Sequence, residues 1–439
     1  MARQPQPLVG ARYTVTVGPI AHGGHCVARH EGRVVFVRHS LPGERVVAEV
    51  TEGDEHSRFL RADAVEVLEA SPDRVPRPCP YAGPGACGGC DFQHVDLSAQ
   101  RRMLADVVVE QMHRIAGHDV QVEVQAVDGD DAGLGWRTRL RFSTDPQGRL
   151  GLRKHRSHEV VPVRSCPIGH PGLPAVTSHR WPGCESVEGV VSAGGDRLVV
   201  VEQAGRRAPR VPAVEADGVV SAAGQRLRGR THVTESGAGR AWRVGATGFW
   251  QVHPGAAETL TRVALEMLAP AAGETALDLY AGVGLFAGAL AARVGADGSV
   301  LAIEGDARAV RDARRNLHDL PQVRLLDGRV ERVLRDLSLD AADVVLLDPP
   351  RTGARRRVVE HVVSLAPRAV CYVACDPAAL ARDVAYFTRR GYVLRELQAF
   401  DIFPMTHHVE CVALLVPWAA GGHDAGGAGG TVLSGNGAG

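Results

Sequence analysis

Residues 275–284 read Thr-Ala-Leu-Asp-Leu-Tyr-Ala-Gly-Val-Gly, an apolar strand pattern that runs into a glycine-rich turn. A helical pattern follows at 285–294, and strands and helices then alternate as far as an apolar run that ends near Pro417. Such an alternation predicts a parallel, doubly wound sheet with helices on its faces. We therefore expect a Rossmann-like domain over residues 239–418 of a multi-domain α/β chain.

The glycine turn indicates a nucleotide-like cofactor. Gly282-x-Gly284-x-x-Ala287 fits the dinucleotide fingerprint, and Glu304 stands about twenty residues on, where it could hold a ribose diol. Asp278, at the end of the first strand, would repel a pyrophosphate but suits a ligand with an ammonium and a sulfonium group. The turn therefore favours S-adenosylmethionine, and an NAD-dependent Rossmann enzyme is the alternative.

A cysteine follows a later strand of the same pattern. Residues 368–374 form an apolar run, and Cys375 comes next, before a helix that Asp376 would cap. Open α/β sheets bind ligands at the carboxyl ends of their strands, and a helix N-terminus favours thiolate over thiol. We interpret Cys375 as a nucleophile, with a buried core cysteine as the alternative.

Two carboxylates complete a chemical set. Asp348 precedes two prolines at a strand end, and Glu410 is the one carboxylate at the head of an apolar strand. Burial would raise the pKa of Glu410 towards that of a general base. A thiol, a carboxylate and a methyl donor together specify methylation of uracil at C5, a carbon too weakly nucleophilic to be methylated directly. Cys375 would add to C6, and Glu410 would remove the C5 proton, with the base turned out of its stack.

The first seventy residues predict a small β-barrel. Short alternating runs are separated by turns at Gly23-Gly24, Glu31-Gly32 and residues 41–44. The pattern over residues 23–28, 35–37 and 41–46 resembles the TRAM domain, an RNA-binding barrel of RNA-modifying enzymes. We therefore expect an OB-like TRAM barrel over residues 1–70.

A cysteine quartet follows the barrel and consists of Cys79, Cys87, Cys90 and the remote Cys166. Cys79 and Cys166 each precede a proline, as in ferredoxin-type ligand runs. One Cys-x2-Cys with two further cysteines predicts a [4Fe-4S] cluster. Structural zinc, which usually has two Cys-x2-Cys pairs, is the alternative.

A basic stretch lies between Cys90 and Cys166. Arg137, Arg139 and Arg141 alternate with other residues, so on a strand their guanidinium groups would share one face and could contact RNA phosphates. A solvated charged strand is the alternative. Together with the cysteines, this stretch predicts a β-rich, iron–sulfur and RNA-binding central domain over residues 71–238. Its helix at 96–116 is expected to pack on the catalytic domain.

Composition adds several expectations. Basic and acidic residues number 50 each, so affinity for nucleic acid must come from a local patch. An odd, clustered set of nine cysteines indicates a reducing compartment. No signal-peptide or membrane-spanning pattern is evident. We expect a cytoplasmic monomer without an obligate protein partner, and a disordered glycine-rich tail at 419–439.

These motifs together resemble the TRAM-containing RNA 5-methyluridine methyltransferases, the class that modifies 23S rRNA or the T-loop of tRNA. The resemblance runs from about Arg12 to Pro417 and implies Cys375 as nucleophile, Glu410 as base and the cysteine quartet as cluster ligands. Contacts to S-adenosylmethionine or uracil are implied for Gln251, Tyr280, Glu304, Asp327 and Asp348.

The chain departs from the family pattern at several places. Leu285 replaces an asparagine after Gly284, His253 stands where asparagine is common, Asp376 replaces asparagine after the nucleophile, and the interval from Cys79 to Cys87 is longer than usual. The RNA target is therefore not inherited from the family, although rRNA is favoured over tRNA. The competing class is a non-catalytic RNA-binding iron–sulfur protein on a methyltransferase fold, whose signature would be loss of Cys375 or Glu410.

Overall fold

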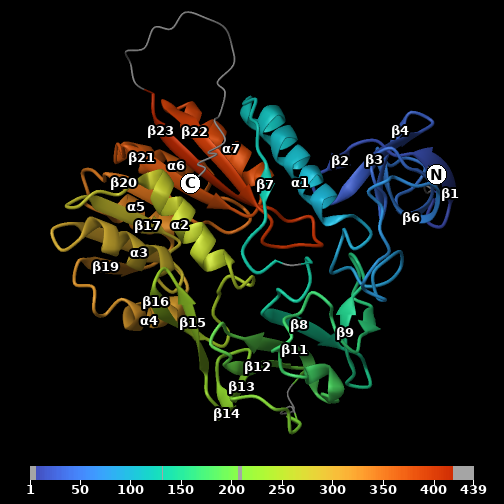
Figure 1. Ribbon diagram of the computed structural model, residues 1–439, viewed down its shortest axis with the longest axis horizontal. Coiled ribbons are helices and arrows are strands. Elements are labelled where there is room, and N and C mark those ends of the chain that lie inside the picture. The colour runs from blue at the N-terminus through green and yellow to red at the C-terminus, as the bar shows by residue number, and fades with distance from the viewer. Residues whose placement is uncertain (1–5, 131, 206–209, 419–439) are drawn as a thin grey trace, which may run out of the picture.

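A computed structural model describes residues 6–130, 132–205 and 210–418. Its strands gather in three regions, an N-terminal sheet, a central sheet and a C-terminal sheet with helices on its faces (Figure 1). The expected disordered tail, residues 419–439, lies outside the described residues.

The N-terminal region is a six-stranded sheet in the order β1-β5-β6-β4-β3-β2. Its strands are antiparallel except for the parallel pair β4 and β6. Buried and exposed residues alternate along β5, where Val46, Ala48 and Val50 face the core, as expected for a sheet with one solvated face. The bounds are β1 Arg12–Thr16, β2 Ile20–Ala21, β3 His25–His30, β4 Arg33–Arg38, β5 Arg45–Glu52 and β6 Phe59–Glu69.

The central region is a seven-stranded sheet in the order β10-β9-β8-β11-β12-β13-β14, beside the hairpin β15-β16. Trp181, Val187, Val199 and Val219 fill its core. Between residues 169 and 239 the sequence showed only weak strand patterns, yet most of this sheet lies there. The bounds are β8 Arg139–Thr144, β9 Leu150–Arg153, β10 Val160–Pro162, β11 Cys184–Val191, β12 Arg197–Gln203, β13 Gly218–Ser221, β14 Arg226–Gly229, β15 His232–Gly237 and β16 Arg240–Gly245, with a short 3-10 turn at Val176–Ser178.

The C-terminal sheet has eight strands in the order β19-β18-β17-β20-β21-β23-β22-β7. The run from β19 to β21 is parallel, whereas β23 is antiparallel to both its neighbours. The strands are β7 Val124–Gln125, β17 Thr275–Leu279, β18 Ser299–Glu304, β19 Val323–Asp327, β20 Val344–Leu347, β21 Ala369–Ala374, β22 Tyr392–Phe400 and β23 Glu410–Pro417. The helices are α2 Ala256–Leu268, α3 Leu285–Val294, α4 Ala307–Asn316, α5 Val330–Asp336, α6 Arg355–Ser364 and α7 Pro377–Thr388.

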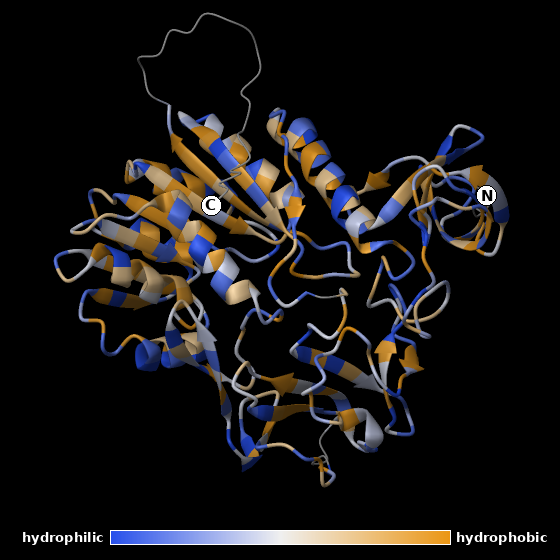
Figure 2. Cartoon of the chain, viewed as in Figure 1, coloured by the Kyte–Doolittle hydropathy of each residue, from blue (hydrophilic) through white to orange (hydrophobic). Residues whose placement is uncertain are grey.

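The expected alternation of strands and helices is confirmed, and β17 and α3 have the expected bounds. Apolar residues concentrate in the strands of this sheet, as Figure 2 shows. Strand β7 joins its edge although it comes from the segment expected to form the central domain. No helix within the described ranges is both long and apolar enough to span a bilayer.

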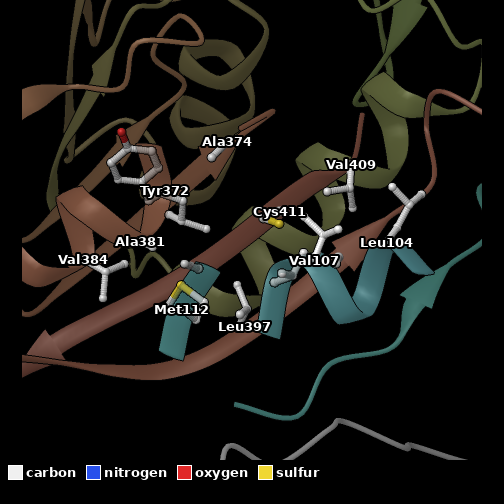
Figure 3. Close-up of a cluster of buried hydrophobic side chains, with 14 of the residues drawn as sticks. Leu104, Val107, Met112, Tyr372, Ala374, Ala381, Val384, Leu397, Val409 and Cys411 are labelled. Atoms are coloured by element: carbon white, nitrogen blue, oxygen red, sulfur yellow. The ribbon is translucent and has the colours of Figure 1, made fainter. Parts of the chain in front are cut away.

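Helix α1 (Leu97–Gln111) also packs on the C-terminal sheet. Asp96 caps it by accepting hydrogen bonds from the backbone N–H groups of Ser98 and Ala99. In Figure 3, Val107 lies beside Cys411 of β23 and Leu104 lies beside Val409. The helix continues into a π-helical turn, Met112–Ala116, that packs against α7. The helix therefore lies against the sheet that carries Cys375, as the sequence predicted.

Candidate active site

Cys375 and Glu410 come together through the register of two strands. β21 and β23 are antiparallel neighbours, and Ala374 pairs with Cys411. The next residue along β21 is Cys375, and the preceding residue of β23 is Glu410, so the register places them across from each other. Asp348 directly follows β20, the parallel neighbour of β21. The three residues singled out from the sequence therefore lie together at the ends of three adjacent strands, along one edge of the sheet.

Burial dominates the electrostatics of this edge. It raises the pKa of Glu410 well above its ordinary value, and repulsion from Asp348 adds to the effect. Burial also raises the pKa of Asp348 to about 7. The raised pKa expected for Glu410 is thus confirmed.

The thiol of Cys375 differs from the thiolate that the sequence predicted. Burial, followed by repulsion from Glu410 and Asp348, raises its pKa to about 12. Desolvation and two neighbouring carboxyl groups thus outweigh the helix N-terminus. The protein without substrate holds Cys375 protonated.

Two side chains beyond the sequence prediction border the same edge. Arg351 follows the two prolines after Asp348, and its guanidinium lies 3.1 Å from Nε2 of His408. Its positive charge lowers the pKa of both Cys375 and Glu410. A cation directly after the Asp-Pro-Pro motif was the available sequence signal, but its proximity to residues 375 and 410 depends on long-range strand pairing.

The N-terminal barrel reaches the nucleophile through His22. Its Nε2 lies 3.3 Å from the carboxylate of Asp376, the residue after Cys375. Asp376 also accepts a hydrogen bond from the backbone N–H of Ala379 and so caps α7. The departure from asparagine at this position therefore adds an ion pair between the barrel and the active site.

The glycine turn between β17 and α3 has the shape expected for a cofactor site. Gly282 and Gly284 have φ values of 57° and 99°, a region that favours glycine. Asp278 is fully buried, and neither of its carboxyl oxygens has a hydrogen-bond partner within the described residues, although the backbone N–H of Ala287 comes near. Burial, then repulsion from Asp348, raises the pKa of Asp278 to about 8. An unpartnered buried carboxyl group fits a cationic ligand.

The other expected cofactor residues lie around the same strand ends. Glu304 accepts hydrogen bonds from the backbone N–H groups of Gly282 (2.8 Å) and Asp306 (2.6 Å), so it also shapes the turn. Asp327 is exposed and lies in register with Glu304 on the adjacent strand. Tyr280 is half-buried, with φ of 69°.

Gln251 is buried and lines a cavity of about 480 Å³ between the central sheet, β15 and the segment at residues 250–254. The neighbouring Phe249 is 67% exposed, an unusual state for a large aromatic residue and therefore a candidate contact for a base. Leu285 and His253, two departures from the family pattern, are buried. His253 stacks on Trp136 with ring centroids 6.1 Å apart, which makes it a packing residue.

The cysteine quartet lines one cavity of about 250 Å³. Cys79, Cys87, Cys90 and Cys166 all contribute to its wall. The backbone N–H of Gly89 points to the Cys87 sulfur and the Gln93 amide to the Cys90 sulfur, each at 3.4 Å. Gly88 packs against the backbone of residue 155, where a Cβ would come within 2.4 Å of a nitrogen. Close chain packing therefore accounts for glycine at this position.

The spacing of these thiols bears on which metal group would fit. Among the described residues, no three His, Cys, Asp or Glu side chains converge closely enough to hold one metal ion. Tetrahedral zinc needs four ligands about 2.3 Å from one point. A cube-shaped cluster carries its iron atoms at separate corners and spaces the thiolates more widely. Four thiols line one cavity and N–H groups are directed at two of the sulfurs, so these residues could hold a metal group.

The three arginines of the basic stretch do not form one exposed row. Arg137 precedes β8, is half-buried and lies 5.7 Å from the ring of Trp136. Arg139 is buried and donates to the carbonyl oxygen of Ala246. Arg141 is exposed and pairs with Glu202. Only the third guanidinium group faces solvent freely enough to meet a phosphate.

Two domain families match the chain. Residues 6–65 match the TRAM domain, and residues 240–417 match the family described as tRNA (Uracil-5-)-methyltransferase. The second match spans the strand ends that carry Asp278, Asp348, Cys375 and Glu410.

Relatives extend the match to almost the whole chain. A protein named uncharacterized RNA methyltransferase from Streptomyces avermitilis is 52% identical over 94% of this chain and all of that protein. One of the same description from Bifidobacterium longum is 39% identical over 91% of this chain and 95% of its own length. Among solved structures, Pyrococcus abyssi tRNA (uracil-54, C5)-methyltransferase in complex with S-adenosyl-L-homocysteine has a TM-score of 0.69, with 22% identity over 92% of this chain and 100% of that chain. The two proteins therefore share their fold over 92% of this chain. The chain belongs to the family of TRAM-containing RNA (uracil-5-)-methyltransferases, which depend on S-adenosylmethionine.

Proposed function

We propose that the protein methylates C5 of a uridine in RNA through a covalent bond between Cys375 and C6 of the uracil. The observation that carries this proposal is the register that sets Cys375 across from Glu410, with Asp348 at the adjacent strand end. A nucleophile and a base that face each other at adjacent strand ends are what the two steps of this reaction need. The intact pair speaks against a retired methyltransferase, and the buried Asp278 speaks against an NAD enzyme.

The residues act in a fixed order. The Cys375 thiol first loses its proton to solvent, the thiolate adds to C6, and the electron pair of the C5–C6 double bond moves to give a nucleophilic C5. After C5 has taken the methyl group, Glu410 removes the C5 proton, the double bond re-forms and the bond to Cys375 breaks. The enzyme regains its thiolate, and the net change at the base is replacement of hydrogen by methyl.

Bound S-adenosylmethionine supplies the electrophilic methyl group. We propose that Asp278 faces its positive charge, that Glu304 accepts from the ribose, and that Gln251, Tyr280, Asp327 and the turn at Gly282 and Gly284 complete the site. A cation beside buried carboxyl groups favours their ionised forms. Glu410 can then act as a base, although its pKa is raised in the free protein.

We further propose that Cys79, Cys87, Cys90 and Cys166 hold a [4Fe-4S] cluster. The cavity that they line supports this, and so do the N–H groups directed at two of the sulfurs. Arg137 and Arg141 also line the cavity. Their charge would offset that of four thiolates, which gives the half-buried Arg137 a role other than RNA binding.

Ribosomal RNA is the proposed substrate, ahead of transfer RNA. Mass spectrometry of nucleosides from both RNAs, with and without the gene, separates them. Loss of 5-methyluridine from tRNA alone would contradict the rRNA assignment.

Glu410→Gln tests the covalent mechanism. The amide keeps the shape of the side chain but cannot take the C5 proton, so the variant should methylate once and then stall. The product would be protein joined through Cys375 to methylated RNA, stable to denaturation and slow in electrophoresis. Cys375→Ala should form no adduct and transfer no methyl group, while Glu396→Gln on the neighbouring strand should turn over normally. Normal turnover by Glu410→Gln would rule the mechanism out.

A further inference from the structure

A second polar cavity, of about 380 Å³, lies between the N-terminal barrel and the central region. His25 of β3, Arg38 of β4 and Arg61 of β6 form its barrel side. His155 and Arg156, from the loop between β9 and β10, face them. The remaining wall consists of Thr51, Glu52, Ala62, Asp63 and Ser157.

Four nitrogen atoms in this wall are buried without a hydrogen-bond partner among the described residues. They are Nε2 of His25 and His155 and Nε of Arg38 and Arg61. His25 and Arg38 are only 7% and 5% exposed. Buried polar atoms are normally satisfied, so the two arginine N–H groups indicate a missing acceptor, and the histidine nitrogens can donate to the same acceptor when they carry a proton.

The charges around the cavity favour an oxyanion as that acceptor. Arg61 and Arg156 both approach the Glu52 carboxylate, at 3.5 and 2.9 Å, so two guanidinium groups already share one oxyanion at the cavity wall. Glu52 is itself 56% exposed and can turn away. The only other lining carboxyl group is Asp63, whose pKa is raised by burial, which favours its neutral form. Arg38 is held in place by Asp91 at 3.0 Å.

An aromatic platform adjoins the arginines. The Phe36 and Phe59 rings lie edge to face at 5.5 Å, and the Arg61 guanidinium is 5.4 Å from the centre of Phe59. Phe59 is 41% exposed. Arginines beside an exposed aromatic ring are the usual elements of a single-strand RNA site, in which phosphates pair and bases stack.

A short segment, from His22 to His25, connects the cavity to the nucleophile. His22 pairs with Asp376, which follows Cys375. His22 and His25 are three residues apart, so their backbones are separated by at most about 11 Å. The His22–Asp376 contact therefore connects this cavity to the active site and places it within reach of an RNA strand whose base enters that site.

We infer that the cavity binds a backbone phosphate of the RNA strand near the target nucleotide, with Phe59 as a stacking platform for a neighbouring base. Glu52 competes for Arg61 and Arg156 until the phosphate displaces it. The inference deepens the proposed function and rests on it for the position of the target base.

The proposed competition by Glu52 gives a specific test, because removing either charge of the same ion pair should change the affinity for RNA in opposite directions. The probe is a fluorescent oligouridylate of about 12 nucleotides, bound to the full-length protein at several salt concentrations. Arg156→Gln and Arg61→Gln should each weaken binding about tenfold and reduce the salt slope by about 0.7, since one phosphate contact is lost. Glu52→Gln should strengthen binding.

The opposite end of the same hairpin provides a matched control. Arg45 and Glu69 form an exposed pair at 3.2 Å on β5 and β6. Arg45→Gln and Glu69→Gln should each change affinity less than about twofold. Arg156 is exposed, so its variant keeps the test valid if Arg61→Gln fails to fold.

Several results would overturn the inference. One is weaker binding of RNA by Glu52→Gln, which would mean that Glu52 holds Arg61 and Arg156 in place and does not compete with the phosphate. Another is an equal loss of affinity in the wild type and in Arg156→Gln when the phosphates of the oligonucleotide are replaced by neutral methylphosphonate linkages. Calorimetric binding of inorganic phosphate that oligouridylate does not displace would assign the cavity to free phosphate.

The outcome is independent of the methylation assay. Opposite effects of Glu52→Gln and Arg156→Gln on binding would uphold the phosphate site even if the wild type made no 5-methyluridine. Methylation with unchanged binding in both variants would uphold the proposed function and reject the site.

Discussion

Arg139 donates a hydrogen bond to the carbonyl oxygen of Ala246, 3.1 Å away and 107 residues further along the chain. This bond ties the first residue of β8 to the segment that leads into Gln251. Burial lowers the pKa of this guanidinium group, and the nearby Glu188 and Glu235 oppose the shift. Arg139 is therefore placed as a structural tie between the central region and the catalytic domain.

Arg139→Ala should lower the free energy of unfolding by about 3 kcal/mol, because it deletes a buried side chain and its charged hydrogen bond to the Ala246 carbonyl. Arg141→Ala removes only an exposed pair with Glu202 and should cost at most about 1 kcal/mol. Denaturant unfolding measures both. A stable Arg139→Ala protein that loses RNA affinity would return Arg139 to the RNA-binding surface.

Cys87→Ser should remove iron and visible absorption from aerobically purified protein, because it deletes one of four cluster ligands. Cys184→Ser, in β11 and outside the cysteine cavity, is the control and should keep its iron. Metal analysis and absorption spectra provide the measurement. Colourless wild-type protein with stoichiometric zinc would contradict the cluster.

The affinity for S-adenosylmethionine should rise with pH. The pKa of Asp278 is raised to about 8, so below that pH the carboxyl group is protonated and a cationic ligand must displace the proton. Affinity should therefore increase by up to about tenfold per pH unit below pH 8 and level off above it. Calorimetry in buffers of different ionisation enthalpy detects the released proton. Asp278→Asn should bind more weakly and without this dependence, and a flat wild-type profile would refute the assignment.

The reactivity of the Cys375 thiol should respond in opposite directions to two nearby charges. Arg351 lowers its pKa and Asp376 raises it. Alkylation by iodoacetamide, followed on the Cys375 peptide by mass spectrometry, should be slower in Arg351→Gln and faster in Asp376→Asn, because thiolate is the reactive form. Asparagine still caps α7, so the second variant should remain folded. Equal rates in both variants would mean that burial alone controls the thiol.

The parts of this structure that follow local rules were predictable. A strand, a glycine turn and a helix at residues 275–294 are encoded by near neighbours, and their bounds agree with the structure. Cys375 and Glu410 could be singled out because each is a lone reactive group at the end of an apolar strand. Their facing positions follow from the antiparallel pairing of β21 and β23, which no local pattern specifies.

The arginine row shows where such reasoning ends. Alternation along a strand places residues on one face but does not say which face is covered. Here Arg137 precedes the strand, and Arg139 is covered by the segment at Ala246. The protonated state of Cys375 was missed for a similar reason, since Glu410 and Asp348 approach it from other strands. Contacts between distant segments decide both cases.

The link between Asp91 and His407 has a consequence for how the protein is made. Asp91 follows Cys90 and accepts from Nδ1 of His407 at 2.6 Å, across 316 residues, while its backbone N–H bonds to the carbonyl oxygen of Met405. A ribosome releases the N-terminal part of a chain well before the C-terminal part. The loop that carries Cys79, Cys87 and Cys90 therefore lacks these contacts until nearly the whole protein has been synthesised. Maturation of the loop should accordingly be a late event, and truncation before residue 405 should leave its cysteines open to oxidation.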